Sequence, residues 1–335
     1  MLQYNKKFKQ LIEKSKNILI ITHRSPDIDA FCSMIMTKLF IEQLDPRKNV
    51  VMKARQMPTA NLPGMKAIHV VEELREGEED LIIVTDAGKM DLCLDFARDQ
   101  LKDTSKEIVC IDHHTEVEDN TDGFVINEKR SSATEQIFAS FKDILGKKFV
   151  LTRDIAELIQ YGIVADTGRF LYETTTPDTL RIFADAKQVF NVDMEAMSYN
   201  AAKFPKEASP AIISYLKTLT IEKDMAYMYI SLDEIEKAGL TKTGVNEAQA
   251  FLRDRYIRFI QGVHWGFVIK PDFDNQDTWF VSFRGTKGYQ EVGEIAQLLG
   301  GGGHPYASAS PLKAKTAEEA LEKVLAAIHQ HLQIS

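Results

Sequence analysis

The feature that most constrains this fold is an alternation of short apolar runs with stretches of helical periodicity, which extends over about the first 190 residues. Four apolar runs are predicted to be strands: Asn17–Thr22, Asn49–Ala54, Leu81–Thr85 and Glu107–Ile111. The predicted helices are Phe31–Gln43, Thr134–Leu145, Arg153–Val164 and Pro177–Phe190. Such alternation is typical of a layered α/β domain. We therefore predict a mainly parallel, doubly wound sheet.

A different pattern begins near residue 211 and predicts a smaller mixed α/β domain. Its predicted strands are Met225–Ser231, Gly266–Lys270 and Trp279–Phe283, and its predicted helices are Gly244–Arg255, Tyr289–Leu299 and Thr316–His331. Between the two patterns, SYNAAKFPKEASP combines two prolines with scattered charge, which is typical of a linker. We predict domains at residues 1–195 and 213–335, joined by a linker at 196–212.

The composition excludes several classes of protein. Apolar residues make up 44% and charged residues 27% of the 335 residues, as in ordinary globular proteins. No apolar run approaches the roughly 20 residues of a membrane-spanning helix, and no secretory h-region follows the N-terminus. The three cysteines form no CxxC pair, which indicates reduced thiols and a cytoplasmic protein. The net charge of −8 argues against binding to long duplex nucleic acid, whereas a short anionic substrate is compatible with it.

Acidic and imidazole side chains follow three of the predicted strands where each strand ends. These residues are His23, Asp27 and Asp29 after the first strand, Asp86 after the third, and Asp112, His113 and His114 after the fourth. Ligands of open α/β sheets bind outside the carboxyl ends of the strands, so a site is expected there. Asp27 and Asp29 could instead cap the next helix. The repetition at three strand ends favours a site over turn chemistry.

A fourth segment, YGIVADTGRF, places Asp166 at the end of a helical apolar run, where it could also be a C-terminal cap. If the four segments converge, they offer carboxylates and imidazoles without thiolates. Such a set favours Mn²⁺ over Mg²⁺, with Zn²⁺ as a competitor. So many carboxylates repel one another unless cations are bound. Two divalent ions about 4 Å apart would fit this set, and such a pair can hydrolyse phosphoesters.

The C-terminal half carries a different signal in Arg284 and in the run Gly300–Gly303 before His304. One glycine after Leu299 would be an ordinary helix cap, whereas four allow backbone N–H groups to approach an anion closely. Arg284 could contact phosphate bidentately, although on its own it would be better explained as a solvated strand-end arginine. No GxGxxG follows the first strand and no GxxxxGK[ST] is present, which disfavours nicotinamide and P-loop nucleotide sites.

Together these motifs resemble those of the DHH phosphoesterase superfamily, in the order of that family. HRSPDIDA, VTDAG, IDHH and VADTG resemble its four metal-binding motifs, and FRG with GGGGH resembles its associated C-terminal domain. The resemblance implies that one metal ion is held by His23, Asp27 and Asp86, and the other by Asp29, Asp86, His113 and Asp166. It further implies that Asp86 bridges the ions, that His114 faces the scissile phosphate and that Asp112 orients the site. The implied substrate-binding residues are Arg284, Gly301, Gly302, Gly303 and His304.

Within the superfamily, the chain is similar to the bifunctional oligoribonucleases. This resemblance implies a Mn²⁺-dependent phosphodiesterase that hydrolyses short oligonucleotides, such as nanoRNA and linear dinucleotides, to mononucleotides. A phosphomonoesterase acting on 3′-phosphoadenosine 5′-phosphate (PAP), or an exopolyphosphatase or pyrophosphatase-like hydrolase, is the alternative enzyme. A module that binds nucleotides without activity is the alternative from another class, but no motif position is missing here. The resemblance is compatible with a homodimer.

Overall fold

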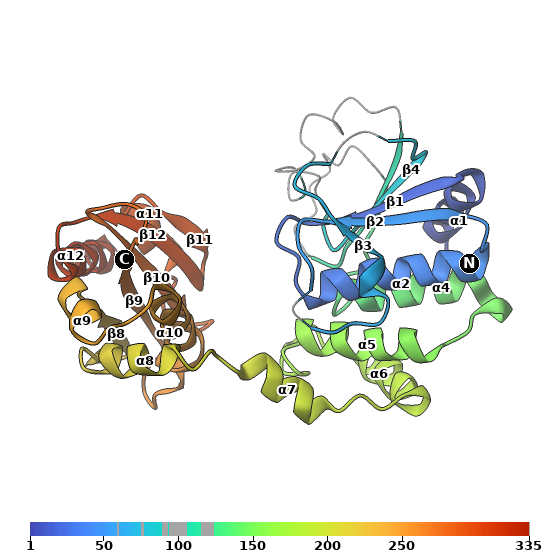
Figure 1. Cartoon of the computed structure of the whole chain (residues 1–335). Helices are drawn as coiled ribbons and strands as arrows, with labels where there is room; N and C mark the ends of the chain where they lie inside the picture. The colour runs from blue at the N-terminus through green and yellow to red at the C-terminus, as the bar shows by residue number, and fades with distance from the viewer. Residues whose placement is uncertain (59, 75–76, 89–92, 94–105, 115–123, 335) are drawn as a thin grey trace. The chain divides into compact units, whose positions relative to one another are not determined.

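The computed structural model describes the whole chain except residues 59, 75–76, 89–92, 94–105, 115–123 and 335. It divides into two compact units, Met1–Met194 and Glu195–Ser335. Each unit has its own six-stranded sheet and its own apolar core (Figure 1). The parallel sheet and the second mixed sheet predicted from the sequence are confirmed.

The sheet of the first unit is parallel throughout. Its strands are β1 (Asn17–Thr22), β2 (Asn49–Ala54), β3 (Ile68–Val70), β4 (Leu81–Thr85), β5 (Glu107–Ile111) and β6 (Phe124–Ile126). The spatial order is β3-β2-β1-β4-β5-β6, so the chain moves outward from β1 to β3 and then returns to β4 on the other side of β1. At such a reversal, loops diverge above the carboxyl ends of β1 and β4, and open α/β sheets bind their ligands there.

The described helices of the first unit form two successive layers beside the sheet (Figure 1). The helices are α1 (Gln3–Lys14), α2 (Ile28–Leu44), α4 (Ala133–Leu145), α5 (Arg153–Asp166) and α6 (Pro177–Val189). Helices α2 and α4 contact the strands, α5 packs on α2, and α6 packs on α5. Helix α2 is apolar around most of its circumference because it lies between the sheet and α5. Strand β4 is buried along its whole length, with Ile83 in the α2 core and Ile82 in the core on the opposite face.

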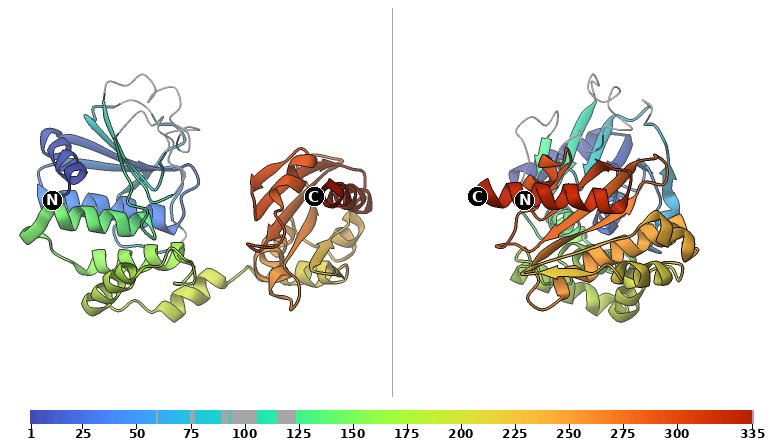
Figure 2. Two further views of the ribbon diagram at one scale, coloured as in Figure 1. Left: turned by 180° about the vertical axis from the view of Figure 1, so that it is seen from behind. Right: turned by 90° about the vertical axis from the view of Figure 1, so that its left-hand side faces the viewer.

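The second unit contains a mixed sheet with the order β11-β12-β10-β9-β8-β7. Its strands are β7 (Thr220–Glu222), β8 (Met225–Tyr229), β9 (Trp265–Pro271), β10 (Thr278–Gly285), β11 (Gly302–His304) and β12 (Ala307–Lys313). Only β8 and β9 pair in parallel among the described strands of this sheet. Two cores cover its two faces, one with α8 (Ala208–Leu216) and α10 (Lys242–Arg255), the other with α11 (Gly293–Leu298) and α12 (Ala317–Ile334). Figure 2 shows this unit, yellow to red, from two further sides.

Several element boundaries differ from the prediction. The strand predicted to reach Ser231 ends at Tyr229, because the Ser231 hydroxyl accepts a hydrogen bond from the Glu234 amide and caps α9 (Leu232–Lys237). The helix predicted from Tyr289 begins at Gly293. The predicted linker 196–212 contains the end of α7 (Met194–Ala202) and the start of α8, and residues 203–207 between them are not helical. Short 3₁₀ turns are η1 (Met65–Ala67), η3 (Gly146–Lys148) and η4 (Ile257–Phe259).

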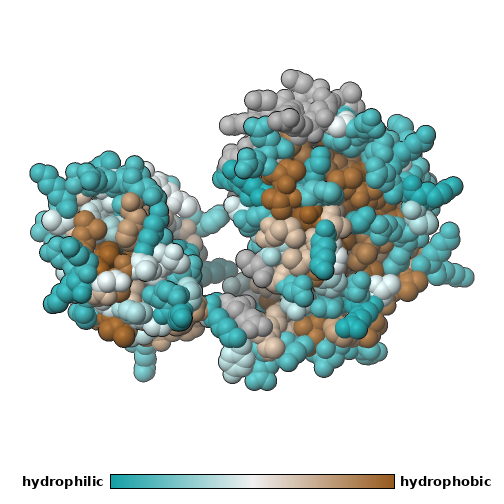
Figure 3. Space-filling model, in the orientation of Figure 1, coloured by the Kyte–Doolittle hydropathy of each residue, from teal (hydrophilic) through white to brown (hydrophobic). Residues whose placement is uncertain are grey.

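The surface and the cysteines have the properties expected from the composition of the chain. In the view of Figure 3, hydrophilic residues form most of the outline of both units. None of the described helices is both long and apolar enough to cross a bilayer. Cys32, Cys93 and Cys110 are buried free thiols, and burial raises the pKa of Cys110 to about 12, which keeps it a neutral thiol.

Candidate metal centre

His23 and Asp86 meet where β1 and β4 end. The parallel pairing of these strands continues to Thr22 and Thr85, so the next residue of each strand leaves the sheet at the same level. Nε2 of His23 lies 3.5 Å from Oδ2 of Asp86. Asp86 has a φ of 57°, a conformation that aspartate adopts more readily than most residues, and its amide donates to the Ile111 carbonyl. This turn holds the Asp86 carboxylate, which is 4% exposed, directly over the end of the sheet.

His113 lies among three carboxylates. Its Nε2 atom is 3.4 Å from Oδ1 of Asp86, 3.3 Å from Oδ2 of Asp166 and 4.0 Å from Oδ2 of Asp29. Its Nδ1 atom lies 3.3 Å from the carbonyl oxygen of Arg130. A metal-binding histidine needs such a partner on its second nitrogen, because the partner fixes the tautomer and the orientation of the ring. The backbone of Arg130 therefore directs Nε2 of His113 toward the carboxylates.

Asp29 and Asp27 have different roles, although the sequence suggested that both could cap the next helix. Asp27 does cap α2, because its Oδ1 atom accepts a hydrogen bond from the Ala30 amide. The Asp29 carboxylate is fully buried and accepts hydrogen bonds from two amides at the N-terminus of α4, Ala133 at 2.7 Å and Thr134 at 3.1 Å. The positive end of the α4 dipole stabilises this anion.

Gly162 allows α5 to approach this carboxylate. A Cβ atom at Gly162 would lie 2.9 Å from Oδ1 of Asp29 and 2.2 Å from Oγ1 of Thr134. Any larger residue would push α5 away from α4. Because Asp166 is the last residue of α5, the glycine lets the helix bring Asp166 to the other carboxylates.

The structure brings all eight predicted residues of the first unit into three overlapping groups. Within each group the potential ligand atoms lie within 4.8 Å of one another. The groups are Asp86, Asp112, His113 and His114; His23, Asp27 and Asp86; and Asp29, His113 and Asp166. Asp86 belongs to two groups, and its two carboxylate oxygens face different imidazoles. This is the arrangement that a bridging carboxylate requires.

The residues fit divalent cations. Oδ1 of Asp86 and Nε2 of His113 are buried and have no hydrogen-bond partner, although buried polar atoms nearly always have one. A cation between them would satisfy both atoms. Carboxylate oxygens and imidazole nitrogens without thiolates are the donors that hard or borderline divalent ions prefer.

The pKa values of the clustered side chains also favour a site for cations. Burial, with Asp86 and Asp166 nearby, raises the pKa of Asp29 well above its usual value. Burial also raises the pKa of Asp166, to about 6. Burial disfavours the charged form of His113, but the nearby carboxylates of Asp86, Asp29 and Asp166 outweigh it and raise the pKa of His113 to about 10. The cluster therefore attracts positive charge, whether protons or metal ions.

His114 has a different environment from His113. Its Nδ1 atom lies 2.8 Å from Oδ1 of the buried Asp112, and its side chain is 57% exposed. The hydrogen bond to Asp112 raises the pKa of His114. The imidazole is thus held in one orientation at the rim of the cluster, where it can hold a proton in contact with solvent or with a ligand.

In the second unit, Arg284 and His304 share one row of the sheet. Arg284 on β10 pairs with Ala307 on β12, and Ala307 pairs with His304 on β11. Paired residues project to the same face, and two strand spacings separate Arg284 from His304 by about 10 Å. Only an alanine lies between Arg284 and His304 in this row.

These geometries agree with the comparisons with known proteins. Residues 17–163 match the model of the DHH family, N-terminal domain. The chain carries a DHH family domain. It is a DHH phosphoesterase, a hydrolase of phosphoester bonds, and the DHH domain implies divalent metal ions.

The relatives of this DHH chain cover almost all of it. It is 27% identical over 308 residues to the bifunctional oligoribonuclease and PAP phosphatase NrnA of Bacillus subtilis. The aligned region covers 88% of this chain and 89% of that protein. It is 27% identical over 316 residues to the probable bifunctional oligoribonuclease and PAP phosphatase NrnA of Streptococcus mutans, with coverages of 90% and 92%. A crystal structure of an exopolyphosphatase-related protein from Bacteroides fragilis shares the fold, with a TM-score of 0.79, 21% identity and coverages of 99% and 97%.

The glycine run of the DHH chain differs from the predicted anion-binding loop. Gly300, with a φ of 79°, lies just after the C-terminal end of α11, whereas Gly302–His304 form the edge strand β11. A Cβ atom at Gly301 would lie 2.2 Å from the Ala309 carbonyl, and one at Gly303 would lie 2.6 Å from the Ala307 carbonyl. Close pairing with β12 is therefore a structural reason for these glycines, beside any role in binding.

Sequence reasoning missed the charged neighbours of Arg284. Nε of Arg284 lies 2.8 Å from Oδ1 of Asp254, and the same oxygen accepts a hydrogen bond from Nε of Arg253 at 2.9 Å. Arg258 donates to the Gly285 carbonyl at 3.2 Å. Burial, with Arg253 nearby, lowers the pKa of Arg284. The signal was present as RDRYIR, a dense group of arginines at the end of a predicted helix.

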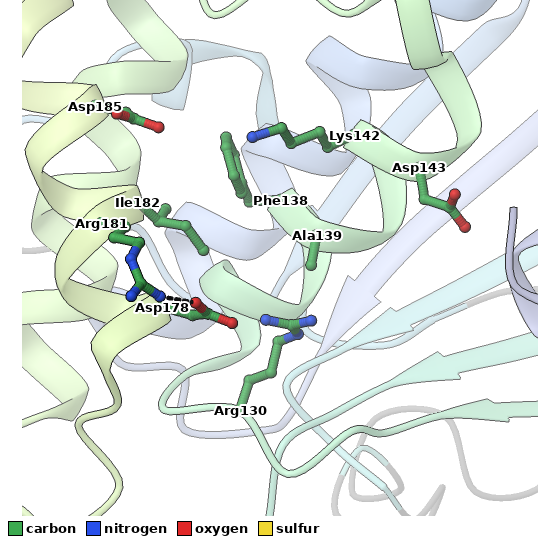
Figure 4. Close-up of a pocket in the computed structure, with 9 residues that line it drawn as sticks. All are labelled: Arg130, Phe138, Ala139, Lys142, Asp143, Asp178, Arg181, Ile182 and Asp185. Atoms are coloured by element: carbon green, nitrogen blue, oxygen red, sulfur yellow. Dashed lines mark hydrogen bonds and ion pairs between the residues drawn. The ribbon is translucent and has the colours of Figure 1, made fainter.

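A separate pocket of about 430 Å³ lies between α4 and α6 of the first unit (Figure 4). Its charged lining residues are Arg130, Lys142, Asp143, Asp178, Arg181 and Asp185. The numbers of basic and acidic groups are equal, so the lining has no charge preference. Arg130 links this pocket to the metal centre, since its side chain lines the pocket and its carbonyl accepts from His113.

Proposed function

We propose that this chain is a Mn²⁺-dependent phosphodiesterase that hydrolyses short oligonucleotides, including nanoRNA and linear dinucleotides, to mononucleotides at a dinuclear site. The observation that carries the proposal is the Asp86 carboxylate, whose two oxygens face two separate groups of potential ligands. The names of the relatives from Bacillus subtilis and Streptococcus mutans support the substrate class.

The proposed ligand sets are those that the resemblance to the DHH family implies, and the short distances from Asp86 to His23 and from His113 to Asp86 and Asp166 support them. One ion would be held by His23, Asp27 and Asp86, and the other by Asp29, Asp86, His113 and Asp166. Two divalent ions in such a site polarise phosphoryl oxygens and stabilise the charge that develops on them during hydrolysis. The mixture of oxygen and nitrogen donors favours Mn²⁺ over Mg²⁺.

His114 and Asp112 would supply the proton that the leaving oxygen needs. Asp112 holds Nδ1 of His114, so a proton on Nε2 is available at the exposed side of the ring. We assign His114 the role of facing the scissile phosphate and delivering this proton to the leaving oxygen. Asp112 acts as its positioning residue, because it is buried and fixes the orientation of the ring.

The second unit would hold the part of the substrate away from the reaction. The guanidinium of Arg284 presents donors in a planar fork that suits a phosphate group. His304, with the backbone of Gly301, Gly302 and Gly303, would contact the terminal nucleotide of the substrate that carries this phosphate group. Arg284 and His304 lie in one row of the sheet with only an alanine between them, which supports a shared ligand.

Phosphate removal from PAP is the second activity that we propose, because the names of both relatives join it to oligoribonuclease activity. PAP and a dinucleotide present the same chemistry to the metal centre, a phosphoester attached to a nucleoside. The two activities therefore require no separate sites.

The proposal is tested with purified full-length protein in Mn²⁺. A 5′-labelled RNA dinucleotide and pentanucleotide are followed over time, and phosphate release is followed from PAP and from tripolyphosphate. We expect mononucleotides from the dinucleotide and phosphate from PAP, and neither product with Asp86→Asn. Phosphate release from tripolyphosphate alone would contradict the proposed substrate, and wild-type protein inert on every substrate would contradict the enzyme.

A further inference from the structure

The turn after α5 has a strained backbone beside the metal centre. Gly168, Arg169 and Phe170 have φ angles of 55°, 64° and 65°. Glycine adopts this left-handed region freely, but arginine and phenylalanine do so at a cost in free energy. Such strain persists only where the surroundings hold it, and it is most common at functional sites.

Thr167 holds this turn in place. Its side chain is fully buried, its hydroxyl accepts a hydrogen bond from the Phe170 amide at 3.0 Å, and its carbonyl accepts from the Leu171 and Tyr172 amides at 3.0 Å. The Phe170 ring packs edge-on against Phe183 of α6, with 4.8 Å between the ring centroids. The turn is therefore anchored on both sides.

The anchored turn directs two apolar side chains to the surface. Leu171 is 80% exposed and Tyr172 is 60% exposed. The Tyr172 ring lies over Gly168, where an added Cβ atom would be 2.6 Å from the ring. Gly168 follows Asp166 by two residues, so their Cα atoms lie within about 7 Å of each other. An exposed aromatic ring thus packs on the turn that directly follows a proposed metal ligand in the chain.

We infer that Tyr172, with Leu171 beside it, stacks against the nucleobase of the nucleotide bound at the metal centre. This inference rests on the proposed function. One side of the Tyr172 ring covers Gly168 and the rest remains open, and an aromatic ring can stack on any base. The base lies one sugar away from the phosphate that the metal centre would bind. This proximity favours a base over a protein partner as the group that covers Tyr172.

The test compares ligands with and without a base. Calorimetry measures the dissociation constants of an RNA dinucleotide and of the same dinucleotide with abasic residues, for wild-type, Tyr172→Ala and Tyr172→Phe full-length protein. Because base stacking is lost, we expect Tyr172→Ala to bind the dinucleotide about 10- to 100-fold more weakly. Tyr172→Phe should stay within about twofold of wild type, and all three proteins should bind the abasic ligand equally.

Tyr199→Ala is the matched control, since Tyr199 is 63% exposed on α7, and its binding should be unchanged. Equal weakening of both ligands by Tyr172→Ala would overturn the inference, because Tyr172 would then support the metal centre itself. Unchanged dinucleotide binding by Tyr172→Ala would also overturn the inference. If this variant in addition sediments with a lower molecular mass than wild type, the exposed surface of Leu171 and Tyr172 would be assigned to contact with a second copy of the chain. Cleavage is scored separately: wild-type protein that binds the dinucleotide through Tyr172 but releases no mononucleotide contradicts the proposed function and leaves the inference standing.

Discussion

The two units bring their candidate functional side chains together by different structural means. In the first unit, parallel strands end side by side, so His23 and Asp86 converge on one point above the sheet. In the second unit, Arg284 and His304 lie in one row across the face of a sheet. Strand ends can surround a small ion from several directions, whereas a sheet face offers an extended surface for a longer ligand. In the proposed function, the first unit performs the chemistry and the second holds the substrate.

The units also differ in how their charges are balanced. Asp29, Asp86 and Asp166 surround a single buried imidazole, so the first unit needs added cations. In the second unit Asp254 already pairs with Arg253 and Arg284. Ligand binding should therefore change the first unit more than the second.

The largest effect should come from Asp86→Asn. Loss of the bridging carboxylate should lower kcat by about 10³-fold or more, since metal ions contribute several kcal/mol of transition-state stabilisation. Steady-state kinetics and metal content by atomic absorption measure the loss. Asp185→Asn, an exposed aspartate of the same unit, is the control and should keep full activity. A variant with kcat within tenfold of wild type would contradict the bridging role.

Metal binding should stabilise the first unit alone. At 100 times its dissociation constant, Mn²⁺ adds about 2.7 kcal/mol to the free energy of unfolding of the unit that binds it. Both tryptophans, Trp265 and Trp279, are buried in the second unit, so their fluorescence reports on that unit while circular dichroism reports on both. In urea, Mn²⁺ should move the circular dichroism transition and leave the fluorescence transition in place. An equal shift of the circular dichroism and fluorescence transitions would contradict a metal site confined to the first unit.

Arg284→Ala should affect binding and leave the chemistry intact. The loss of a charged hydrogen-bonding partner costs about 1.5–3 kcal/mol, which corresponds to a KM roughly 10- to 150-fold higher at similar kcat. Arg284→Lys should recover only part of the loss, because a lysine cannot contact phosphate bidentately. Arg181→Ala, which removes a 72% exposed arginine of the first unit, serves as the control. A fall in kcat without a change in KM would place Arg284 in the chemistry instead.

The smallest effect should come from Asp254→Asn. If Arg284 binds the substrate phosphate, Asp254 competes with that phosphate, but the Arg284–Asp254 pair is partly exposed and contributes at most about 1 kcal/mol. The variant should lower KM by roughly two- to fivefold. A higher KM would mean that Asp254 instead holds Arg284 in position for the substrate.

The sequence predicted much of the fold because its patterns are local. Strands β1, β2, β4 and β5 have the predicted bounds, since short apolar runs bounded by polar residues are a strong local signal. The edge strands β3, β6, β7 and β11 were not predicted, because each is three residues long and depends on pairing with a neighbour for its conformation. The glycines of β11 appeared to form a loop for the same reason.

The residues of the candidate metal centre were also predictable, because each lies near the beginning or the end of a recognisable strand or helix. The sequence by itself determined which side chains stand at the strand ends and that they suit divalent ions. Only the tertiary structure decided that Asp29 is bound by the amides of α4 and that Asp86 faces two imidazoles. Likewise, only the structure brought Arg253 and Asp254 to Arg284, and left Tyr172 exposed over Gly168 on the turn after Asp166. Such contacts depend on packing between elements distant in the chain or on an uncommon backbone turn, and neither leaves a periodic pattern in the sequence.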